Sequence, residues 1–378
     1  MIVGIPKEIL EGEKRVAATP QTVKDLMKCD LEVHVQASAG NASHYLDKDY
    51  EEAGAKIISD AATILTQSDL VIKVATATSD EVELLKEGSA YISLIQTTRD
   101  IDIVKKLTHK KISAFSMHLI PRTTLAQSMD ALSSQANVAG YKAVLIGAMH
   151  LPIYMPLLMT AAGTIPPAKV LILGAGVAGL QAIATAKRLG AQVEVFDVRP
   201  EVKEQVESLG AKFVEVESSE DDGVGEGGYA KETSDEYKEK QQALMKEHIV
   251  KSDLVITTAL IPGKAAPILI SKDMVDAMKK GSVVVDLAAE NGGNCEYTKA
   301  GEVINQNDII IDGTLNLPSS MQVHSSQLYA KNISTFITHM MKEGNLNIDL
   351  DDEIISGSMF THQGKITHEP TQQAVENL

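Results

Sequence analysis

The sequence predicts an α/β protein with two doubly wound parallel-sheet domains joined by long helices. Short apolar runs of strand length alternate with helical stretches, and this alternation occurs in two separate series. The length of 378 residues fits two domains at roughly 100–200 residues each. A glycine-rich turn between a strand and a helix opens the second series.

The first series predicts one sheet. Its strands are expected at residues 2–5, 31–35, 70–74, 90–95 and 112–115. Thr19 and Pro20 are a helix start signal, because Thr is a good N-cap and Pro suits the first helical position. Strands that alternate with helices form parallel sheets covered on both faces.

The second series begins at Lys169 and predicts a second sheet. Its strands are expected at residues 170–173, 193–196, 213–216, 254–257, 283–286 and 309–311. A long helix at 123–149 joins the two series, and a helix at 322–341 returns to the first domain. The tail at 345–378 reads as irregular, with a short hairpin around Gln363-Gly364. The expected domains are 1–126 plus 320–378, and 127–319.

Composition excludes several classes of function. The net charge of −16 repels nucleic acid and anionic lipid. Two cysteines cannot form a disulfide framework, and no Cys-x-x-Cys metal spacing exists, so we expect a reduced compartment and no metal. No signal peptide is expected before the first strand. Residues 143–166 are uncharged, but prolines interrupt them, so we predict a buried helix and loop rather than a membrane span.

The turn Gly174-Ala175-Gly176-Val177-Ala178-Gly179 is a dinucleotide-binding fingerprint in its full context. A strand precedes it and a helix at 180–189 follows, so unpaired N–H groups at the helix N-terminus can hold phosphates. Asp197 ends the next strand, 18 residues after Gly179, where a carboxylate accepts ribose hydroxyls and repels a 2′-phosphate. This predicts NAD rather than NADP, although Arg199 could accommodate NADP.

A polar stripe follows Arg122 on the connecting helix. At 3.6 residues per turn, one face carries mostly uncharged polar side chains, namely Gln127, Asp130, Ser134, Asn137 and Tyr141, opposite Met129, Leu132, Ala136 and Ala143. A solvated face normally carries Lys and Glu, and that interpretation stays open. Because the helix leads into the dinucleotide-binding domain, Arg122, Gln127 and Asp130 could grip the amide and ribose of a nicotinamide.

These residues resemble a known family over essentially the whole chain. The opening motifs are Gly4-Ile5-Pro6-Lys7-Glu8 and Gly12-Glu13-Lys14-Arg15-Val16. The stretches 122–141, 159–179, 257–264, Asp286-Leu287-Ala288 and Gly292-Gly293-Asn294-Cys295 continue the match. Together they are similar to the alanine dehydrogenase/transhydrogenase superfamily, and within it to the NAD(H)-binding component of proton-translocating transhydrogenases, which is domain I and the first section of the alpha subunit.

The resemblance implies two Rossmann-like domains with NAD(H) in the cleft between them. It places Arg122, Gln127, Ser128, Met129, Asp130, Ser133 and Tyr141 at the nicotinamide. It places Gly174, Gly176, Val177, Ala178, Gly179, Asp197, Val198 and Arg199 at the adenine half and pyrophosphate, and Gly228, Tyr229, Gln241 and Leu260 along the site. The glycine-rich insertion at about 217–241 matches the family's mobile loop, which closes over the nucleotide. Thr233 stands where relatives often have Met.

One departure separates the two branches of the family. Alanine dehydrogenases use an Arg, a Lys and a His for the keto acid, and here the matching positions hold Arg15, Lys73 and Gln96. Without an imidazole the keto acid loses its general acid, so we expect Arg15 and Lys73 to be only structural or vestigial. An alanine dehydrogenase-like enzyme remains the alternative, and a non-catalytic NAD-binding regulatory subunit is a third.

The transhydrogenase branch implies a hydride transfer that needs neither metal nor flavin. The type expected is the proton-translocating, Re/Si-specific one, not the Si-unspecific flavoenzyme. The chain carries one glycine fingerprint between a strand and a helix, so NADP(H) must come from a partner, the NADP(H)-binding (beta) component. A transmembrane component would translocate protons. The family implies a homodimer, without membrane insertion of its own, active only with its partners at the cytoplasmic face of the inner membrane.

Overall fold

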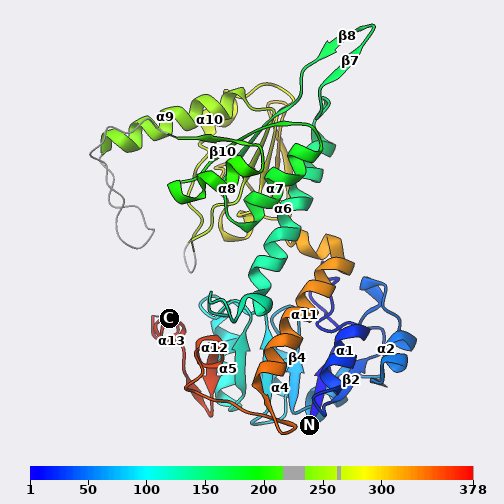
Figure 1. Ribbon diagram of the computed structural model, residues 1–378. Helices are drawn as coiled ribbons and strands as arrows, with labels where there is room; N and C mark the ends of the chain where they lie inside the picture. Colours follow the sequence, from blue (N-terminus) through cyan, green and yellow to red (C-terminus); the bar gives the residue numbers. More distant parts are fainter. Residues whose placement is uncertain (216–234, 262–264, 378) are drawn as a thin grey trace. The chain divides into compact units, whose positions relative to one another are not determined.

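The computed structural model describes residues 1–215, 235–261 and 265–377. The chain divides into two compact units, which we call unit 1 (Met1–Gln135 and Pro318–Leu378) and unit 2 (Ala136–Leu317). Each unit is built around its own large, mostly parallel sheet with helices packed on it (Figure 1). The prediction of an α/β fold with two doubly wound sheets is confirmed.

The sheet of unit 1 has the strand order β19-β18-β6-β5-β4-β1-β2-β3. All neighbours from β6 to β3 pair parallel, whereas β18 pairs antiparallel with both β6 and β19. The strands are β1 (Ile2–Ile5), β2 (Glu32–Gln36), β3 (Lys56–Ile58), β4 (Leu70–Ile72), β5 (Ala90–Ser93), β6 (Ser113–Ser116), β18 (Met359–His362) and β19 (Lys365–Ile366).

Both faces of this sheet are buried. Leu70 and Ile72 of β4 belong to one apolar cluster, and Val71 between them belongs to another. Alternation of this kind is what a strand covered on two sides requires. The helices of unit 1 are α1 (Pro20–Met27), α2 (Asp47–Ala53), α3 (Ala61–Gln67), α4 (Ser79–Leu84), α5 (Ile101–His109), α11 (Gln322–Met340), α12 (Glu353–Ser358) and α13 (Glu369–Glu376).

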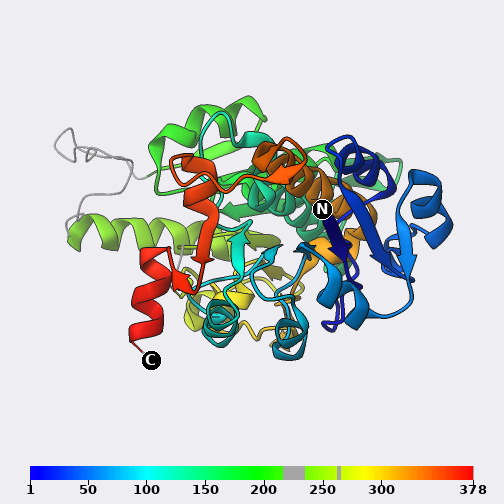
Figure 2. The ribbon, with the colours of Figure 1, turned by 90° about the horizontal axis from the view of Figure 1, so that it is seen from below.

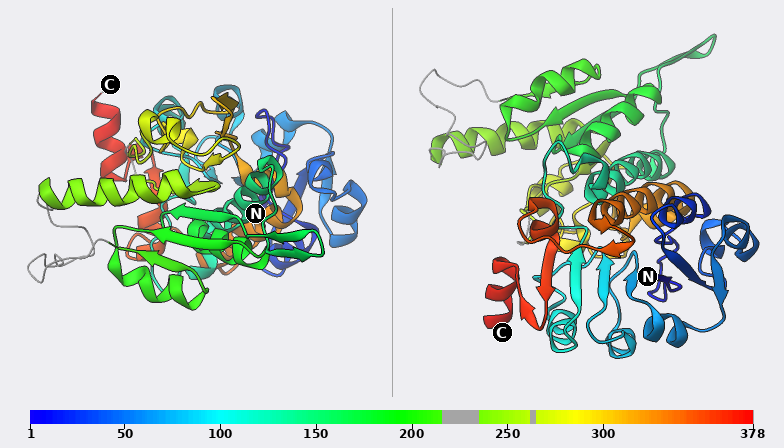
Figure 3. Two further views of the ribbon diagram at one scale, coloured as in Figure 1. Left: turned by 90° about the horizontal axis from the view of Figure 1, so that it is seen from above. Right: turned by 60° about the horizontal axis from the view of Figure 1, so that its bottom comes forward.

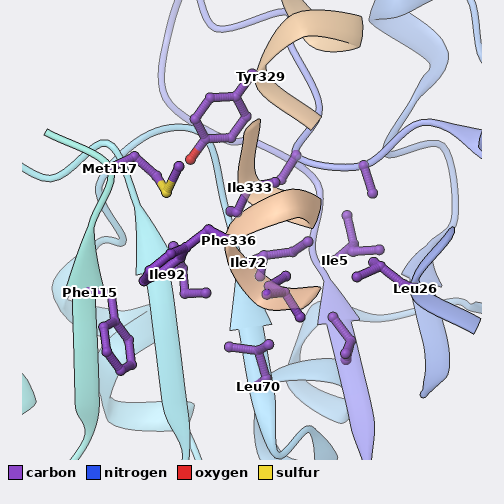
Figure 4. Close-up of a cluster of buried hydrophobic side chains, with 14 of the residues drawn as sticks. Ile5, Leu26, Leu70, Ile72, Ile92, Phe115, Met117, Tyr329, Ile333 and Phe336 are labelled. Carbon is purple, nitrogen blue, oxygen red and sulfur yellow. The ribbon is translucent and has the colours of Figure 1, made fainter. Parts of the chain in front are cut away.

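Helix α11 returns to unit 1 after the whole of unit 2, as predicted, and packs beside α1 (Figures 1 and 2). It contributes Tyr329, Ile333 and Phe336 to the first apolar cluster (Figure 4). The ring of Phe336 meets Phe115 of β6 edge-on, with centroids 5.7 Å apart. The predicted start signal at Thr19-Pro20 is also confirmed, because the Thr19 side chain caps α1.

The prediction of an irregular tail is wrong. Residues after 345 contain α12, α13 and two strands, and β18 extends the sheet of unit 1 alongside β6 (Figure 3). A second small hairpin, β16 (Met341–Lys342) with β17 (Asn345–Leu346), precedes them. The predicted hairpin at Gln363-Gly364 is confirmed, and both residues have positive φ, 46° and 78°.

The sheet of unit 2 has the order β11-β10-β9-β12-β13-β15-β14, parallel except for β14. The strands are β9 (Lys169–Leu173), β10 (Gln192–Phe196), β11 (Lys212–Val214), β12 (Leu254–Thr257), β13 (Val283–Asp286), β14 (Val303–Gln306) and β15 (Ile309–Asp312). Successive residues of β9 again alternate between two apolar clusters. The chain order therefore reverses between β9 and β12, the position at which such sheets bind ligands.

The helices of unit 2 are α7 (Val177–Arg188), α8 (Lys203–Ser208), α9 (Asp235–Lys251) and α10 (Lys272–Asp276). Every predicted strand run contains a strand, with ends that differ from the prediction by at most two residues. The predictions missed β3 and β14, whose residues are exposed or half-buried, so neither strand has the continuous apolar run expected of a buried strand.

The predicted helix at 123–149 begins later than expected. Residues Gln127–Met129 form a separate turn of 3₁₀-helix, η2, and α6 runs from Ala131 to His150. Asp130 stands before α6 and acts as its cap, because its Oδ1 accepts a hydrogen bond from Ser133 N at 2.8 Å. Gln127 and Asp130 therefore do not share a helical face with Asn137 and Tyr141, and that portion of the stripe prediction is wrong.

The prediction of a buried helix and loop at 143–166 holds only as far as the end of α6. Beyond it, β7 (Leu158–Thr160) and β8 (Gly163–Ile165) form an exposed antiparallel hairpin that projects from the body of unit 2 (Figures 1 and 3). Within the described ranges, no helix has both the length and the apolar character needed to cross a bilayer.

Candidate functional site

The turn between β9 and α7 is tight, because its backbone segments lie very close to one another. A Cβ on Gly179 would lie 1.9 Å from the carbonyl oxygen of Gly174, and Gly174 itself has φ of +106°. A Cβ on Gly174 would lie 2.4 Å from the Thr258 hydroxyl at the end of β12. Side chains at either position would force the turn open, so the two glycines are steric requirements of this geometry.

Gly176 differs from these two glycines. A Cβ built on it meets no atom of the described chain within 4 Å. It is the N-cap of α7, and no side chain from the described residues caps that helix. The first N–H groups of α7 thus have no side-chain cap from the described residues, and an anion such as a pyrophosphate fits both these donors and the positive end of the helix dipole.

Gly140 is a functional position that sequence reasoning missed. A Cβ there would lie 2.0 Å from the carbonyl oxygen of Ala178, so the glycine lets α6 cross against the first turn of α7. The sequence signal was present as an isolated glycine inside a helical pattern, which usually has a packing reason.

Asp197 stands where the fingerprint predicts an acidic residue, directly after β10. Its Oδ2 accepts a hydrogen bond from Ala175 N at 2.6 Å, which ties it to the glycine turn. Arg199 donates to the same carboxylate from its backbone N, its Nε and one terminal nitrogen, at 2.9–3.0 Å. Burial raises the pKa of Asp197, but these hydrogen bonds outweigh it and hold the pKa below its ordinary value.

This pairing gives Arg199 a definite partner. The sequence left open whether Arg199 favours a 2′-phosphate, and here its guanidinium is bound to Asp197. A carboxylate has about four acceptor sites, so the four donors occupy Asp197 fully. A ribose diol would have to replace the guanidinium to bond with this carboxylate.

The predicted nicotinamide residues from Arg122 to Ser133 belong to unit 1. Asp130 accepts from Ser133 through both oxygens, at 2.8 Å from the backbone N and 2.6 Å from the hydroxyl. Gln127 and Ser128 are exposed, whereas the Met129 side chain belongs to the unit 1 core. Asn332 of α11 donates to the Ser128 carbonyl at 2.9 Å and thereby fixes η2.

The remaining predicted residues belong to unit 2 or lie outside the described ranges. Tyr141 on α6, Val198 after β10 and Leu260 after β12 are exposed, and Gln241 on α9 is half-buried. Gly228, Tyr229 and Thr233, and with them most of the predicted mobile loop at 217–241, lie outside the described residues. So do residues 262–264. Among the residues that are described, no group of His, Cys, Asp or Glu could hold a metal ion.

Arg15 and Lys73 are paired with carboxylates inside unit 1. Arg15 donates to Glu13 at 2.6 and 2.8 Å and to Gln135 at 2.8 Å. Lys73, fully buried, donates to Glu81 at 2.5 Å and lies 3.7 Å from Glu8. Both cations thus neutralise neighbouring carboxylates, which is what the structural role expected of them requires.

Glu8 is the unusual member of this buried group. Its Oε1 accepts a hydrogen bond from Val74 N at 2.6 Å, while its buried Oε2 has the Lys73 ammonium 3.7 Å away but no hydrogen-bond donor in the described structure. Burial raises the pKa of Glu8 to about 7, although the charge of Lys73 and the Val74 hydrogen bond oppose the shift.

Two models of one protein family match consecutive stretches of this chain. The model described as "Alanine dehydrogenase/PNT, N-terminal domain" matches residues 4–139. The model described as "Alanine dehydrogenase/PNT, C-terminal domain" matches residues 143–369.

Individual relatives point to one branch of this family. The chain is 47% identical to the first section of the NAD(P) transhydrogenase alpha subunit of Rhodospirillum rubrum, covering 97% of this chain and 98% of that protein. It is also 47% identical to "NAD(P) transhydrogenase subunit alpha" of Haemophilus influenzae, covering 97% of this chain and 71% of the relative. The crystal structure of transhydrogenase from Sinorhizobium meliloti superposes with a TM-score of 0.89 at 44% identity, covering 97% of this chain and all of that one.

Gly176 and Gly179 have different surroundings, so replacing each by alanine should have a different effect. Gly176→Ala should fold like the wild type, because its Cβ meets open space, yet it should bind NADH weakly because the methyl group occupies the path of the pyrophosphate. Gly179→Ala should lower the melting temperature as well, since its Cβ collides with the Gly174 carbonyl. Calorimetric NADH titration and thermal melting check both; equal stability losses in the two variants would contradict the steric assignment.

The raised pKa of Glu8 predicts a pH-dependent stability. Unfolded, its carboxyl ionises near pH 4.5, and folded near 7, so the folded chain holds the extra proton between these values. The stabilisation is complete below about pH 4.5 and is lost as pH rises through 7, by up to about 1.4 kcal/mol per pH unit. Glu8→Gln should therefore lose less stability than the wild type from pH 5 to 8 in urea unfolding. Exposed Glu52→Gln is the control, and parallel profiles for wild type and Glu8→Gln would refute the assignment.

Proposed function

Because the chain belongs to the alanine dehydrogenase/PNT family, we propose that it is the NAD(H)-binding component of a proton-translocating NAD(P) transhydrogenase. The observation that carries this proposal is the closed glycine turn at the N-terminus of α7, which no side chain of the described residues caps and which Ala175 N joins to Asp197. The names of the most similar relatives support the transhydrogenase branch.

The residues of the turn would hold the adenine half and pyrophosphate of NAD(H). The backbone of Gly174, Gly176 and Gly179, with Val177 and Ala178, would present N–H groups to the phosphates. Asp197 would accept the adenosine ribose hydroxyls as Arg199 gives way, and its charge would disfavour a 2′-phosphate. Val198 would also contact this half, and the lining of the site would include Gly228, Tyr229, Gln241 and Leu260.

The nicotinamide end would be oriented by residues before and within α6, namely Arg122, Gln127, Asp130, Ser133 and Tyr141, with Ser128 and Met129 of η2. When bound, NAD(H) supplies the ring carbon C4 that accepts or releases a hydride, a hydrogen with both electrons of its C–H bond. The protein residues exchange no proton with that carbon, so their contribution is orientation and exclusion of water. The pairing of Asp130 with Ser133 and the hold of Asn332 on Ser128 support a rigid nicotinamide-facing turn.

The second nucleotide, NADP(H), would be bound by a partner subunit, and a membrane subunit would couple hydride transfer to proton translocation. The names of the relatives specify an alpha subunit or its first section, which supports an assembly with other subunits. On this proposal the chain is a peripheral component at the cytoplasmic face of the inner membrane. It would be of the Re/Si-specific type, inactive in hydride transfer until its partners are present.

The alanine dehydrogenase alternative has a direct test. Gln96 stands in place of a general acid, and its side chain accepts a hydrogen bond from Arg99 at 3.3 Å. Arg15 and Lys73 are already paired with carboxylates. Incubation with NAD and L-alanine should therefore yield no NADH. Substantial NADH formation would contradict the transhydrogenase proposal and support the alternative. A regulatory subunit would bind NADH but transfer no hydride with any partner.

Partner-dependent hydride transfer should respond to Asp130→Asn. Asn is as good an N-cap as Asp, so α6 should stay intact while the charge is lost. With this chain supplied with NAD and the NADP(H)-binding component supplied with [4-²H]NADPH, deuteride passes from NADPH to NAD and leaves NADP. Mass spectrometry should then detect deuterium in NADH for the wild type, and the variant's rate should fall at least about tenfold. Its affinity for NADH should change less, because Asp130 is assigned to alignment.

Asp60→Asn is the matched control for this experiment. Asp60 caps α3 with the same pattern, accepting from the backbone N and the hydroxyl of Thr63, both at 2.8 Å. Its substitution makes the same chemical change away from the proposed site and should leave the rate unchanged. Equal losses of NADH affinity and transfer rate in Asp130→Asn would contradict the alignment role.

The β7–β8 hairpin supports a homodimer as the working form. An isolated two-stranded hairpin is marginal in water, and this one exposes Met159 to 72% with Tyr154, Leu157 and Ile165 beside it. Residues 143–166 carry no charge, while the chain as a whole carries −16. Two copies of so acidic a chain repel one another, so their contact is best made through an uncharged surface.

Met159→Glu should convert this dimer to a monomer, because each copy would then bring an unpaired carboxylate into an apolar contact. Leu350→Glu places the same charge at an exposed apolar position of unit 1 and should leave the assembly unchanged. Native mass spectrometry of the two variants and the wild type distinguishes these outcomes. A wild-type monomer, or a dimer that tolerates Met159→Glu, would rule out the hairpin contact.

A further inference from the structure

Asn294 is a fully buried amide whose hydrogen-bonding groups bridge two chain segments. It follows the glycine pair after β13, and its Nδ2 donates to the carbonyl oxygens of Ala259 at 2.9 Å and Pro267 at 2.8 Å. Its Oδ1 accepts a hydrogen bond from Ala259 N at 3.1 Å. Both backbone groups of Ala259 are therefore bound to one side chain, which fixes the orientation of that residue.

Asn294 is itself held from beneath by Asp286 at the end of β13. The carboxylate of Asp286 accepts from the backbone N of Asn294 at 2.7 Å and from the hydroxyls of Thr257 and Thr298 at 2.8 and 2.6 Å. Thr257, Asp286 and Asn294 are buried and Thr298 is half-buried. In such surroundings a satisfied polar network is rigid and an unpaired member is costly. The path from Asp286 through Asn294 to Ala259 is a chain of hydrogen bonds.

The segment that Asn294 fixes lies against the glycine turn. Thr258, one residue before Ala259, donates its hydroxyl to the carbonyl of Gly174 at 3.1 Å. Leu260 and Ile261, which follow Ala259, expose 53% and 45% of their surface, although most large apolar side chains of unit 2 are buried. Leu260 and Ile261 are therefore exposed apolar side chains near the proposed pyrophosphate site, and they follow a residue whose backbone orientation is fixed.

The strand order assigns this segment to one half of the dinucleotide. In the sheet, β9 lies between β10 and β12. Asp197, after β10, marks the adenosine ribose, and the turn after β9 marks the pyrophosphate. The remaining half of an extended dinucleotide continues over β12, where Leu260 and Ile261 stand.

We infer that Asn294 is a positioning residue for the nicotinamide half of NAD(H), acting through Ala259 on the apolar side chain of Leu260. The inference rests on the proposed function and deepens it. Asn294 touches no substrate; it sets the backbone that presents Leu260. Its amide holds Ala259 without a charge of its own.

Binding of two probes to the full chain tests this role. NADH contains both halves, whereas ADP contains only the adenosine and the phosphates. Asn294→Asp keeps the shape and the acceptor for Ala259 N but leaves both carbonyls facing an oxygen. NADH should bind at least about tenfold more weakly, while ADP should bind as it does to the wild type. A general loss of structure would weaken both probes together.

Two further variants keep the test decisive. Asn305→Asp makes the same substitution at an exposed position of β14, whose Oδ1 accepts from Asp308 N, and should change neither affinity. Leu260→Ala alters an exposed side chain, so it should fold even if Asn294→Asp does not, and it should lose NADH affinity selectively. In that background Asn294→Asp should add little further loss.

The outcomes separate the inference from the function on which it rests. Selective loss of NADH in both Asn294→Asp and Leu260→Ala supports it. Equal loss of NADH and ADP in Asn294→Asp, or wild-type NADH binding by Leu260→Ala, overturns it while leaving the proposed function intact. A wild-type chain that binds neither probe overturns the proposed function and this inference together.

Discussion

The contact between Gly179 and the Gly174 carbonyl sets the geometry of unit 2. Since even a methyl group would lie 1.9 Å from that oxygen, α7 can start only where a glycine allows it to approach the end of β9. This closeness fixes where α7 begins relative to β9. It also brings Ala175 N within 2.6 Å of Asp197 and the Thr258 hydroxyl within 3.1 Å of Gly174. Three strands are thereby joined at one turn by contacts that leave no space for rearrangement.

Unit 1 meets a different constraint, the burial of charge. Glu8, Lys73 and Glu81 lie where ionised groups are costly unless paired, and here two carboxylates share one ammonium. Such a group is favourable when one carboxylate holds a proton, which agrees with the raised pKa of Glu8. The result ties β1, β4 and α4 together without leaving an accessible cation. A site that holds an anionic substrate through a lysine would need that lysine free of protein carboxylates, whereas Lys73 is paired with Glu8 and Glu81.

Sequence patterns predicted what depends on local or periodic chemistry. Buried strands such as β9 and β12 are continuous apolar runs, and the fingerprint from Gly174 to Gly179 needed only its neighbouring strand and helix to be interpreted. Composition misled at residues 158–165, because an uncharged segment resembles a buried one whether or not anything covers it. The start of α6 was misplaced because Asp130 can be either a helical residue or a cap, and only the Ser133 contacts decide.

The least predictable feature of the site is the set of long-range hydrogen bonds. Asn332 bonds to Ser128, which is 204 positions away in the sequence, and Asn294 bonds to Ala259, which is 35 positions away. No local sequence pattern predicts either hydrogen bond. Their chemistry nevertheless fits the proposed reaction. On the proposed function, hydride transfer between two nicotinamides takes no proton from the protein, so the site needs no side chain that acts as a general acid or base. A buried amide satisfies backbone donors and acceptors at once and keeps the same charge at every physiological pH. If the site works by orientation, neutral side chains that hydrogen-bond to the backbone suit it well. Each unit has such a side chain: Asn332 fixes Ser128 in unit 1, and Asn294 fixes Ala259 in unit 2.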